Sequence, residues 1–102
     1  MSKPQLFILE MPFIDPAMGD SQWFCADCAL IEGALTLNPH WQDGITVKRI
    51  PFEKPRREVV DLLGEDNQWL PVLIRDGEPP LTDPVAIATW LAQTYGGASP
   101  HP

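Results

Sequence analysis

The stretch Leu70-Pro71-Val72-Leu73-Ile74-Arg75-Asp76-Gly77 decides how this chain folds. Its apolar run predicts a strand, and the proline stands at the beginning of that strand, where a missing N–H is tolerated. Asp76-Gly77 is typical of a hairpin turn, so a very short antiparallel strand is expected near residues 78–81. The sequence therefore predicts a hairpin in the C-terminal part of the sheet.

A helix is predicted after that hairpin. Thr82 or Asp83 caps it, Pro84 occupies its first position, and Gly96-Gly97 ends it. Its predicted buried stripe consists of Ile87, Ala88, Trp90, Leu91 and Tyr95. The residues after Gly97 are expected to form a loose tail.

Two strand–helix pairs are predicted before the hairpin. Residues 6–11 and 45–50 are apolar or β-branched runs, which indicate strands. Residues 24–38 carry apolar side chains at helical spacing, and a short second helix is expected between Pro55 and Gly64.

Residues 12–23 have no sustained period and are expected to form a loop that is long enough to be functional. The resulting order, β-α-β-α-β-β-α, predicts a single α/β (α+β) domain over residues 1–102, with its core at about 5–96 and its tail at 97–102. A parallel first half joined to a terminal hairpin gives a four-stranded mixed sheet with helices on both faces.

Composition narrows the class of partner. The chain has 102 residues, with 7 Lys and Arg against 14 Asp and Glu, and its bases are scattered. Nucleic acid is not an expected partner, because phosphate binding needs a concentrated basic face. The first residues contain too short an apolar run for a signal peptide or a membrane span, so a cytoplasmic protein is expected, as a monomer or a homodimer.

The two cysteines lie in Trp23-Phe24-Cys25-Ala26-Asp27-Cys28, a C-x-x-C at the start of the first predicted helix. A thiolate at Cys25 would be stabilised by free backbone N–H groups and the helix dipole, and Cys28 could then close a disulfide onto it. The same spacing suits half of a zinc site, for which the chain offers only His40 and His101 as imidazoles. An inert, buried pair is the third interpretation.

Several neighbouring residues have an expected place. Phe24 falls on the buried stripe of the first helix, whereas Trp23 suits the core and an aromatic wall over a ligand equally well. His40 is expected at an exposed turn. Arg56-Arg57 is expected to be solvated, because cations gain nothing from a helix N-terminus.

The element order, the C-x-x-C and the proline that opens the third strand resemble the thioredoxin superfamily. The closest shapes are the glutaredoxins and the N-terminal domain of glutathione transferases. The strongest resemblance lies in residues 68–77 and 81–87, with their Leu-Pro-Val-Leu, Asp-Gly, Thr-Asp and Ala-Ile pieces. The chain also resembles a small bacterial family known only as a domain of unknown function, which implies no activity.

The thioredoxin-like resemblance implies that Cys25 is the exposed nucleophile and Cys28 the buried resolving thiol. It also implies that Pro71 is a cis-proline facing the disulfide, with the Leu70 backbone aimed at a ligand. Thr82 and Asp83 would hold the γ-glutamyl end of glutathione, which is implied as a co-substrate, with no bound cofactor and no metal.

The sequence thus favours a glutaredoxin-like thiol–disulfide oxidoreductase, with catalytic residues Cys25 and Cys28 and substrate contacts at Trp23, Leu70, Pro71, Thr82 and Asp83. Its partner would be a small-molecule or protein thiol or disulfide. Two alternatives stay open. One is a non-catalytic binding or assembly module, which Asp27 and the acidic surface favour because the Asp27 charge opposes a thiolate at Cys25. The other is a metal-binding domain that uses the C-x-x-C.

Overall fold

β1 (Gln5–Leu9) is the central strand of a three-stranded sheet in the computed structural model, which describes residues 3–53, 56–64 and 68–102. It pairs in parallel with β4 (Thr46–Ile50) and antiparallel with β5 (Val72–Ile74). The strand order is β4-β1-β5, so the sheet is mixed, as the sequence predicts.

The expected fourth strand is reduced to a single bridge. Leu73 N donates to Leu81 O over 2.8 Å, and Leu81 N donates back to Leu73 O over 3.0 Å. The chain reverses between them at Asp76-Gly77, where Gly77 has a φ of +74°. Pro79 and Pro80 have no N–H to donate, so the pairing does not extend into a strand. The hairpin is present, but the very short fourth strand predicted near residues 78–81 is only this bridge, so the sheet has three strands and not the four predicted.

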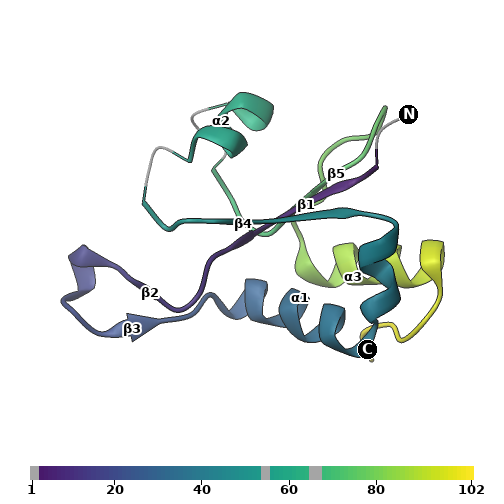
Figure 1. The fold of residues 1–102 in the computed structure, drawn as a ribbon, viewed down its shortest axis with the longest axis horizontal. Helices are drawn as coiled ribbons and strands as arrows, with labels where there is room; N and C mark the ends of the chain where they lie inside the picture. Colours follow the sequence, from purple (N-terminus) through teal and green to yellow (C-terminus); the bar gives the residue numbers. More distant parts are fainter. Residues whose placement is uncertain (1–2, 54–55, 65–67) are drawn as a thin grey trace.

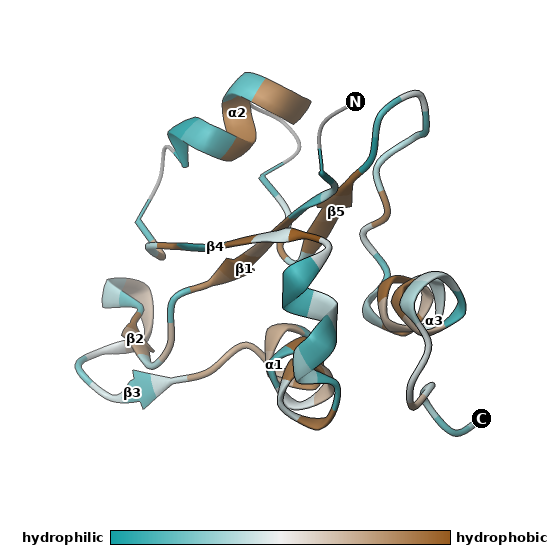
Figure 2. Ribbon diagram, turned by 45° about the vertical axis from the view of Figure 1, so that its right-hand side comes forward, coloured by the Kyte–Doolittle hydropathy of each residue, from teal (hydrophilic) through white to brown (hydrophobic). Residues whose placement is uncertain are grey.

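Helices cover both faces of the sheet (Figure 1). α1 (Ala26–Leu37) and α3 (Pro84–Tyr95) lie together on one face, and α2 (Arg57–Leu63) lies on the other. Alternate residues of β1 point to opposite faces of the sheet. Leu6 and Ile8 pack in the core under α1 and α3, whereas Phe7 packs in a second cluster with Val59 of α2. Figure 2 shows this apolar character along β1 and β5.

The caps of these helices follow from the sequence. The Asp83 carboxylate accepts from Ala86 N over 2.9 Å, and Pro84 is the first residue of α3. α2 ends at Gly64, which has a φ of +90°. Its expected opening residue, Pro55, lies outside the described residues. In the part of the chain that the structure describes, no helix has the length and apolar character needed to cross a lipid bilayer.

Residues 12–23, expected as a loop, form a small two-stranded unit that we call the arm. It consists of β2 (Phe13–Ile14), the 3₁₀ turn η1 (Pro16–Met18) and β3 (Gln22–Trp23), with Phe13 paired to Trp23. The prediction that residues 12–23 form a loop without strands is therefore wrong. Two-residue strands are too short to show alternation, and two prolines mask them. Figure 1 shows the arm projecting beside the beginning of α1.

The other end of α1 is fastened to the C-terminal segment. A second 3₁₀ turn, η2 (Pro39–Asp43), buries Trp41, whose indole N–H donates to Gly96 O over 2.7 Å. The buried Asn38 amide donates to Ala98 O, and Ala98 N donates to Asn38 Oδ1 over 2.8 Å. The first residues of the expected loose tail are thus bonded to the domain. Its looseness stays a prediction.

Candidate thiol site

Cys25 occupies the N-cap position of α1. Its backbone is extended, with φ of −83° and ψ of 119°, and its Sγ accepts the N–H of Cys28 over 3.2 Å. The sulfur thus takes the place that a hydroxyl or carboxylate oxygen usually takes at a helix start. The Cys25 N–H points the other way and donates to Met11 Sδ over 3.2 Å. Cys25 is half-buried, so its sulfur is held beside free helix N–H groups without being sealed off.

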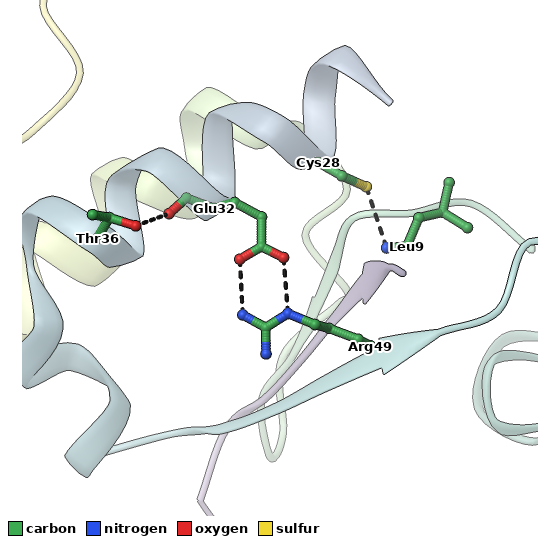
Figure 3. A network of polar contacts seen from close by, with 5 residues as sticks. All are labelled: Leu9, Cys28, Glu32, Thr36 and Arg49. Carbon is green, nitrogen blue, oxygen red and sulfur yellow. Dashed lines mark hydrogen bonds and ion pairs between the residues drawn. The ribbon is translucent and has the colours of Figure 1, made fainter. Parts of the chain in front are cut away.

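Cys28 is one turn further along α1 and is fully buried. Its Sγ accepts the backbone N–H of Leu9 over 3.5 Å, which ties α1 to the end of β1 (Figure 3). Burial raises the pKa of the Cys28 thiol from 9.0 to about 12, although the Leu9 N–H acts against it; contact with Cys25 and the charge of Asp27 raise it further. Both cysteines are free thiols. At neutral pH Cys28 is therefore protonated, and Cys25 is the accessible sulfur.

Arg56 precedes α2 and has an unusual environment for a cation. It is only 8% exposed, so the expectation of a solvated side chain is wrong for Arg56, while Arg57 is exposed as expected. Its guanidinium donates to Phe52 O from Nε and Nη2, over 3.2 and 3.0 Å, and to Gln68 O from Nη1 over 2.8 Å. It also lies over the Phe52 ring, 5.3 Å from the centroid.

The partners of Arg56 are thus neutral. Among the described residues no carboxylate forms an ion pair with it, although buried cations are normally paired. Burial lowers the pKa of the Arg56 guanidinium, and the charges of Cys28 and Cys25 act in the opposite direction. The two sulfurs are therefore within electrostatic range of a buried cation. Sequence reasoning missed this residue, because no local pattern shows that Phe52 and Gln68 enclose it.

Leu70 and Pro71 stand at the entrance to β5. The Leu70–Pro71 peptide bond is cis, as the resemblance implies, and a second cis bond joins Met11 to Pro12. Pro71 is buried, and Leu70 packs against the same apolar cluster as Cys25 and Cys28. The structure thus brings Leu70 and both cysteines into one cluster. That Pro71 faces a disulfide stays a prediction.

The aromatic residues just before Cys25 are exposed. Trp23, in β3, is 41% exposed, and Phe24 is 68% exposed because it precedes the N-cap and is not on the buried face of α1. The prediction that Phe24 is a core residue is wrong. The apolar spacing of residues 24, 28, 31 and 35 did not reveal that the helix begins after Phe24.

The Thr82-Asp83 corner is exposed directly before α3. Thr82 is exposed and lines a cavity of about 480 Å³ together with Leu62, Leu63, Trp69 and Pro80. Asp83 is exposed, and its carboxylate is engaged in capping α3. None of the other predicted site residues lines that cavity. The corner's role in binding a ligand stays a prediction.

The two imidazoles do not join the thiols in the part of the chain that the structure describes. His40 is exposed in η2, where its Nε2 contacts Gly96 O over 3.0 Å, and His101 is exposed in the tail, next to Pro102 O. Within residues 3–53, 56–64 and 68–102 no group of three or more His, Cys, Asp and Glu is placed to hold a metal ion. A metal at Cys25 and Cys28 would need ligands beyond the groups that the described residues bring to these two sulfurs.

Comparison with known proteins places the chain in a family. The family model described as protein of unknown function, DUF3088, matches residues 3–99. The chain belongs to the DUF3088 family. No curated protein and no solved structure matches it. The chemistry of this DUF3088 protein must therefore be argued from its own residues.

Proposed function

We propose that this DUF3088 protein is a glutaredoxin-like thiol–disulfide oxidoreductase that uses Cys25 as nucleophile and Cys28 as resolving thiol. The observation that carries the proposal is the bond from Cys28 N–H to Cys25 Sγ at the start of α1, with the Cys28 thiol buried directly behind it. A half-exposed sulfur that accepts a helix N–H is in the setting that activates a cysteine.

In the first step, the Cys25 thiolate attacks one sulfur of a substrate disulfide. A bond forms between Cys25 Sγ and that sulfur, and the other substrate sulfur leaves as a thiolate. The Cys28 N–H supports the charge on Cys25 Sγ before the attack. The buried Arg56 guanidinium is a second source of stabilisation, because a thiolate at Cys25 would supply the negative charge that its neutral partners do not.

In the second step, Cys28 loses its proton to the departing thiolate or to water and attacks Cys25 Sγ. The Cys25–Cys28 disulfide forms, and the second substrate thiolate is released. The substrate gains two electrons, and the protein's dithiol loses them. Two molecules of a small thiol such as glutathione, oxidised to its disulfide, would restore the reduced pair. The pKa of about 12 for Cys28 fits a thiol that reacts only after the mixed disulfide has formed.

The fold is part of the proposal. The mixed sheet with helices on both faces, the C-x-x-C at the start of α1 and the hairpin that follows β5 support a thioredoxin-like topology. We propose the cytoplasm as its compartment, since two unbridged cysteines suit a reducing environment.

The deciding experiment is alkylation of the native protein across pH 5–10, with mass spectrometry to identify the labelled thiol. We expect Cys25 to be labelled in the folded protein faster than a cysteine in an unfolded peptide, and Cys28 to react only after unfolding. Cys25→Ser should remove disulfide reduction, by about 1,000-fold or more, whereas Cys28→Ser should still form a mixed disulfide. Full disulfide reduction by Cys25→Ser would falsify the proposal.

A non-catalytic binding module is the second candidate. The exposed Asp27 in the first turn of α1 favours it, because this carboxylate opposes a negative charge on Cys25. In that case Cys25 would label no faster than a cysteine in an unfolded peptide. The alkylation profile therefore separates the two candidates.

A further inference from the structure

A cavity of about 290 Å³ lies between the arm and the segment that follows β4. Phe13 and Ile14 line it from β2, and Phe52 and Glu53 line it from the facing segment. The rings of Phe13 and Phe52 are stacked, with centroids 4.5 Å apart and planes 6° from parallel. The cavity thus has an aromatic wall made of two segments far apart in the sequence.

This cavity adjoins the proposed nucleophile. Two of its lining residues, Glu10 and Pro12, are the chain neighbours of Met11, whose Sδ accepts the Cys25 N–H over 3.2 Å. Phe13, Phe52 and Cys25 also pack against the same core cluster. Met11 and this shared cluster thus connect the wall of the cavity to Cys25.

The arm presents large apolar side chains to solvent. Ile14 is 50% exposed, Met18 60% and Phe24 68%. They belong to the segment that runs from β2 to Cys25, so this segment and the stacked rings present an apolar surface. Clustered exposed apolar residues are typical of a surface that contacts another protein.

Acidic residues predominate on the arm side of this surface, whereas on the other side Arg56 lies buried over the Phe52 ring and the exposed Arg57 follows it. Between Pro4 and Val47 the sequence contains six Asp and Glu and no Lys or Arg. Two carboxylates, Glu10 and Glu53, line the cavity itself, and both residues are exposed. Such a field attracts cations and repels anions, including glutathione disulfide.

We propose that the arm and this cavity bind a cationic polypeptide, so that the disulfide delivered to Cys25 belongs to a cysteine in a basic stretch of a protein. The apolar wall takes a hydrophobic side chain of that polypeptide, and Glu10 and Glu53 pair with its Lys or Arg. This inference rests on the proposed function for its chemistry, whereas its binding step is independent of any thiol.

The binding test uses the full-length Cys25→Ser variant and three fluorescently labelled decapeptides without cysteine. The peptides share a central Leu and differ in net charge, +4, 0 and −4. We expect the cationic peptide to bind about tenfold more tightly than the neutral one at low salt, and to weaken toward it at 0.5 M salt. Glu10→Gln/Glu53→Gln should remove most of that advantage.

The matched control is Asp43→Asn/Asp61→Asn, which removes the same total charge at exposed positions in η2 and α2. It should change peptide affinity by less than about twofold, because neither Asp43 nor Asp61 lines the cavity and isolated exposed charges contribute little to binding. Equal binding of the three peptides, or equal loss in both double variants, overturns the proposal. So does a dimer, seen by sedimentation, that Ile14→Ser dissociates, because a second copy would then be the occupant of the arm.

A kinetic test separates this proposal from the proposed function. The cationic peptide is now made with one cysteine, and this cysteine and that of glutathione are each converted to a mixed disulfide with thionitrobenzoate. Each disulfide is mixed with Cys28→Ser, and release of the coloured thionitrobenzoate anion is followed. We expect the cationic peptide to react about tenfold faster. Equal rates would overturn the docking proposal and leave the redox function standing. Selective binding without thiol reactivity would support the docking surface and remove the redox function.

Discussion

The two ends of α1 differ in what holds them. At the C-terminal end the buried Asn38 amide bonds to Ala34 O and to both backbone groups of Ala98. At the N-terminal end a half-buried sulfur, Cys25 Sγ, caps the helix, and the preceding Phe24 is exposed. One end is closed by strong oxygen and nitrogen contacts, whereas the other relies on sulfur.

This difference teaches where the fold's stability and its chemistry are located. Hydrogen bonds between buried nitrogen and oxygen groups are costly to break, so they belong to the structural end. Sulfur is a weak acceptor and a good nucleophile, so a cap made of sulfur stabilises the helix less and leaves a reactive group available. Substitutions at the two ends should therefore have separate consequences.

The largest effect on stability is expected from Asn38→Ala. The substitution leaves the Ala98 N–H and the Ala34 and Ala98 carbonyls without their side-chain partner, so the free energy of unfolding should fall by about 3 kcal/mol in urea denaturation. The matched control is Thr36→Ala, whose exposed hydroxyl donates to Glu32 O, with an expected loss of about 0.5 kcal/mol. Equal losses in the two variants would show that the C-terminal end is not the structural one. Cys25 alkylation of folded Asn38→Ala should match wild type.

A smaller effect on stability is expected from the ionisation of Cys28. Its pKa is about 12 in the folded protein and 9.0 when exposed, so above pH 9 the unfolded chain loses a proton that the folded one keeps. The contribution of the protonated Cys28 to the free energy of unfolding is therefore complete below pH 9 and declines as the pH rises toward 12. Between pH 8 and 10 wild type should lose about 1.4 kcal/mol more than Cys28→Ala, measured by urea denaturation with a non-thiol reductant. Parallel pH curves for the two proteins would contradict a buried, protonated Cys28.

The smallest effect is expected from substitutions of Arg56, which test the reactivity of the thiol at the N-terminal end of α1. Arg56→Met should slow alkylation of Cys25 at pH 7 by about fivefold, because a thiolate there loses a cation within electrostatic range. Arg57→Met removes the same charge from an exposed neighbour and should change the rate by less than about twofold.

Arg56→Lys distinguishes charge from packing at that position. It retains the cation but cannot make the same set of bonds to Phe52 O and Gln68 O, so it should be less stable than wild type yet recover much of the alkylation rate at pH 7. If Arg56 had only a structural role, folded Arg56→Met and Arg56→Lys would both alkylate Cys25 at the wild-type rate.

Much of the fold was predictable because its signals are local. The helical spacing of residues 28, 31 and 35, the Asp83-Pro84 cap and the Asp76-Gly77 turn each specify their element within a few residues. The alternation of Leu6, Phe7 and Ile8 between two cores agrees with helices on both faces. The place of Cys25 near the start of α1 was predictable for the same reason, but its N-cap position was not, because the apolar spacing extends to Phe24.

The errors have a common cause, which is contact between distant segments. The arm forms because Phe13 pairs with Trp23 and stacks on Phe52. The spacing of apolar residues within 12–23 does not indicate these contacts. Arg56 is buried because Phe52 and Gln68 close around it. Of the candidate site, the sequence therefore predicted the two sulfurs, but neither the buried cation nor the cavity beside them.

The bond between Asn38 and Ala98 also has a practical consequence for protein engineering. It fixes the C-terminal segment beside the far end of α1, where Figure 1 marks the C-terminus. Twelve helical residues separate that end from Cys25, a distance of about 18 Å along the axis. A fluorescent protein or an affinity tag joined after Pro102 would thus leave the molecule away from the thiol, and immobilisation through such a tag would keep the arm turned toward solution.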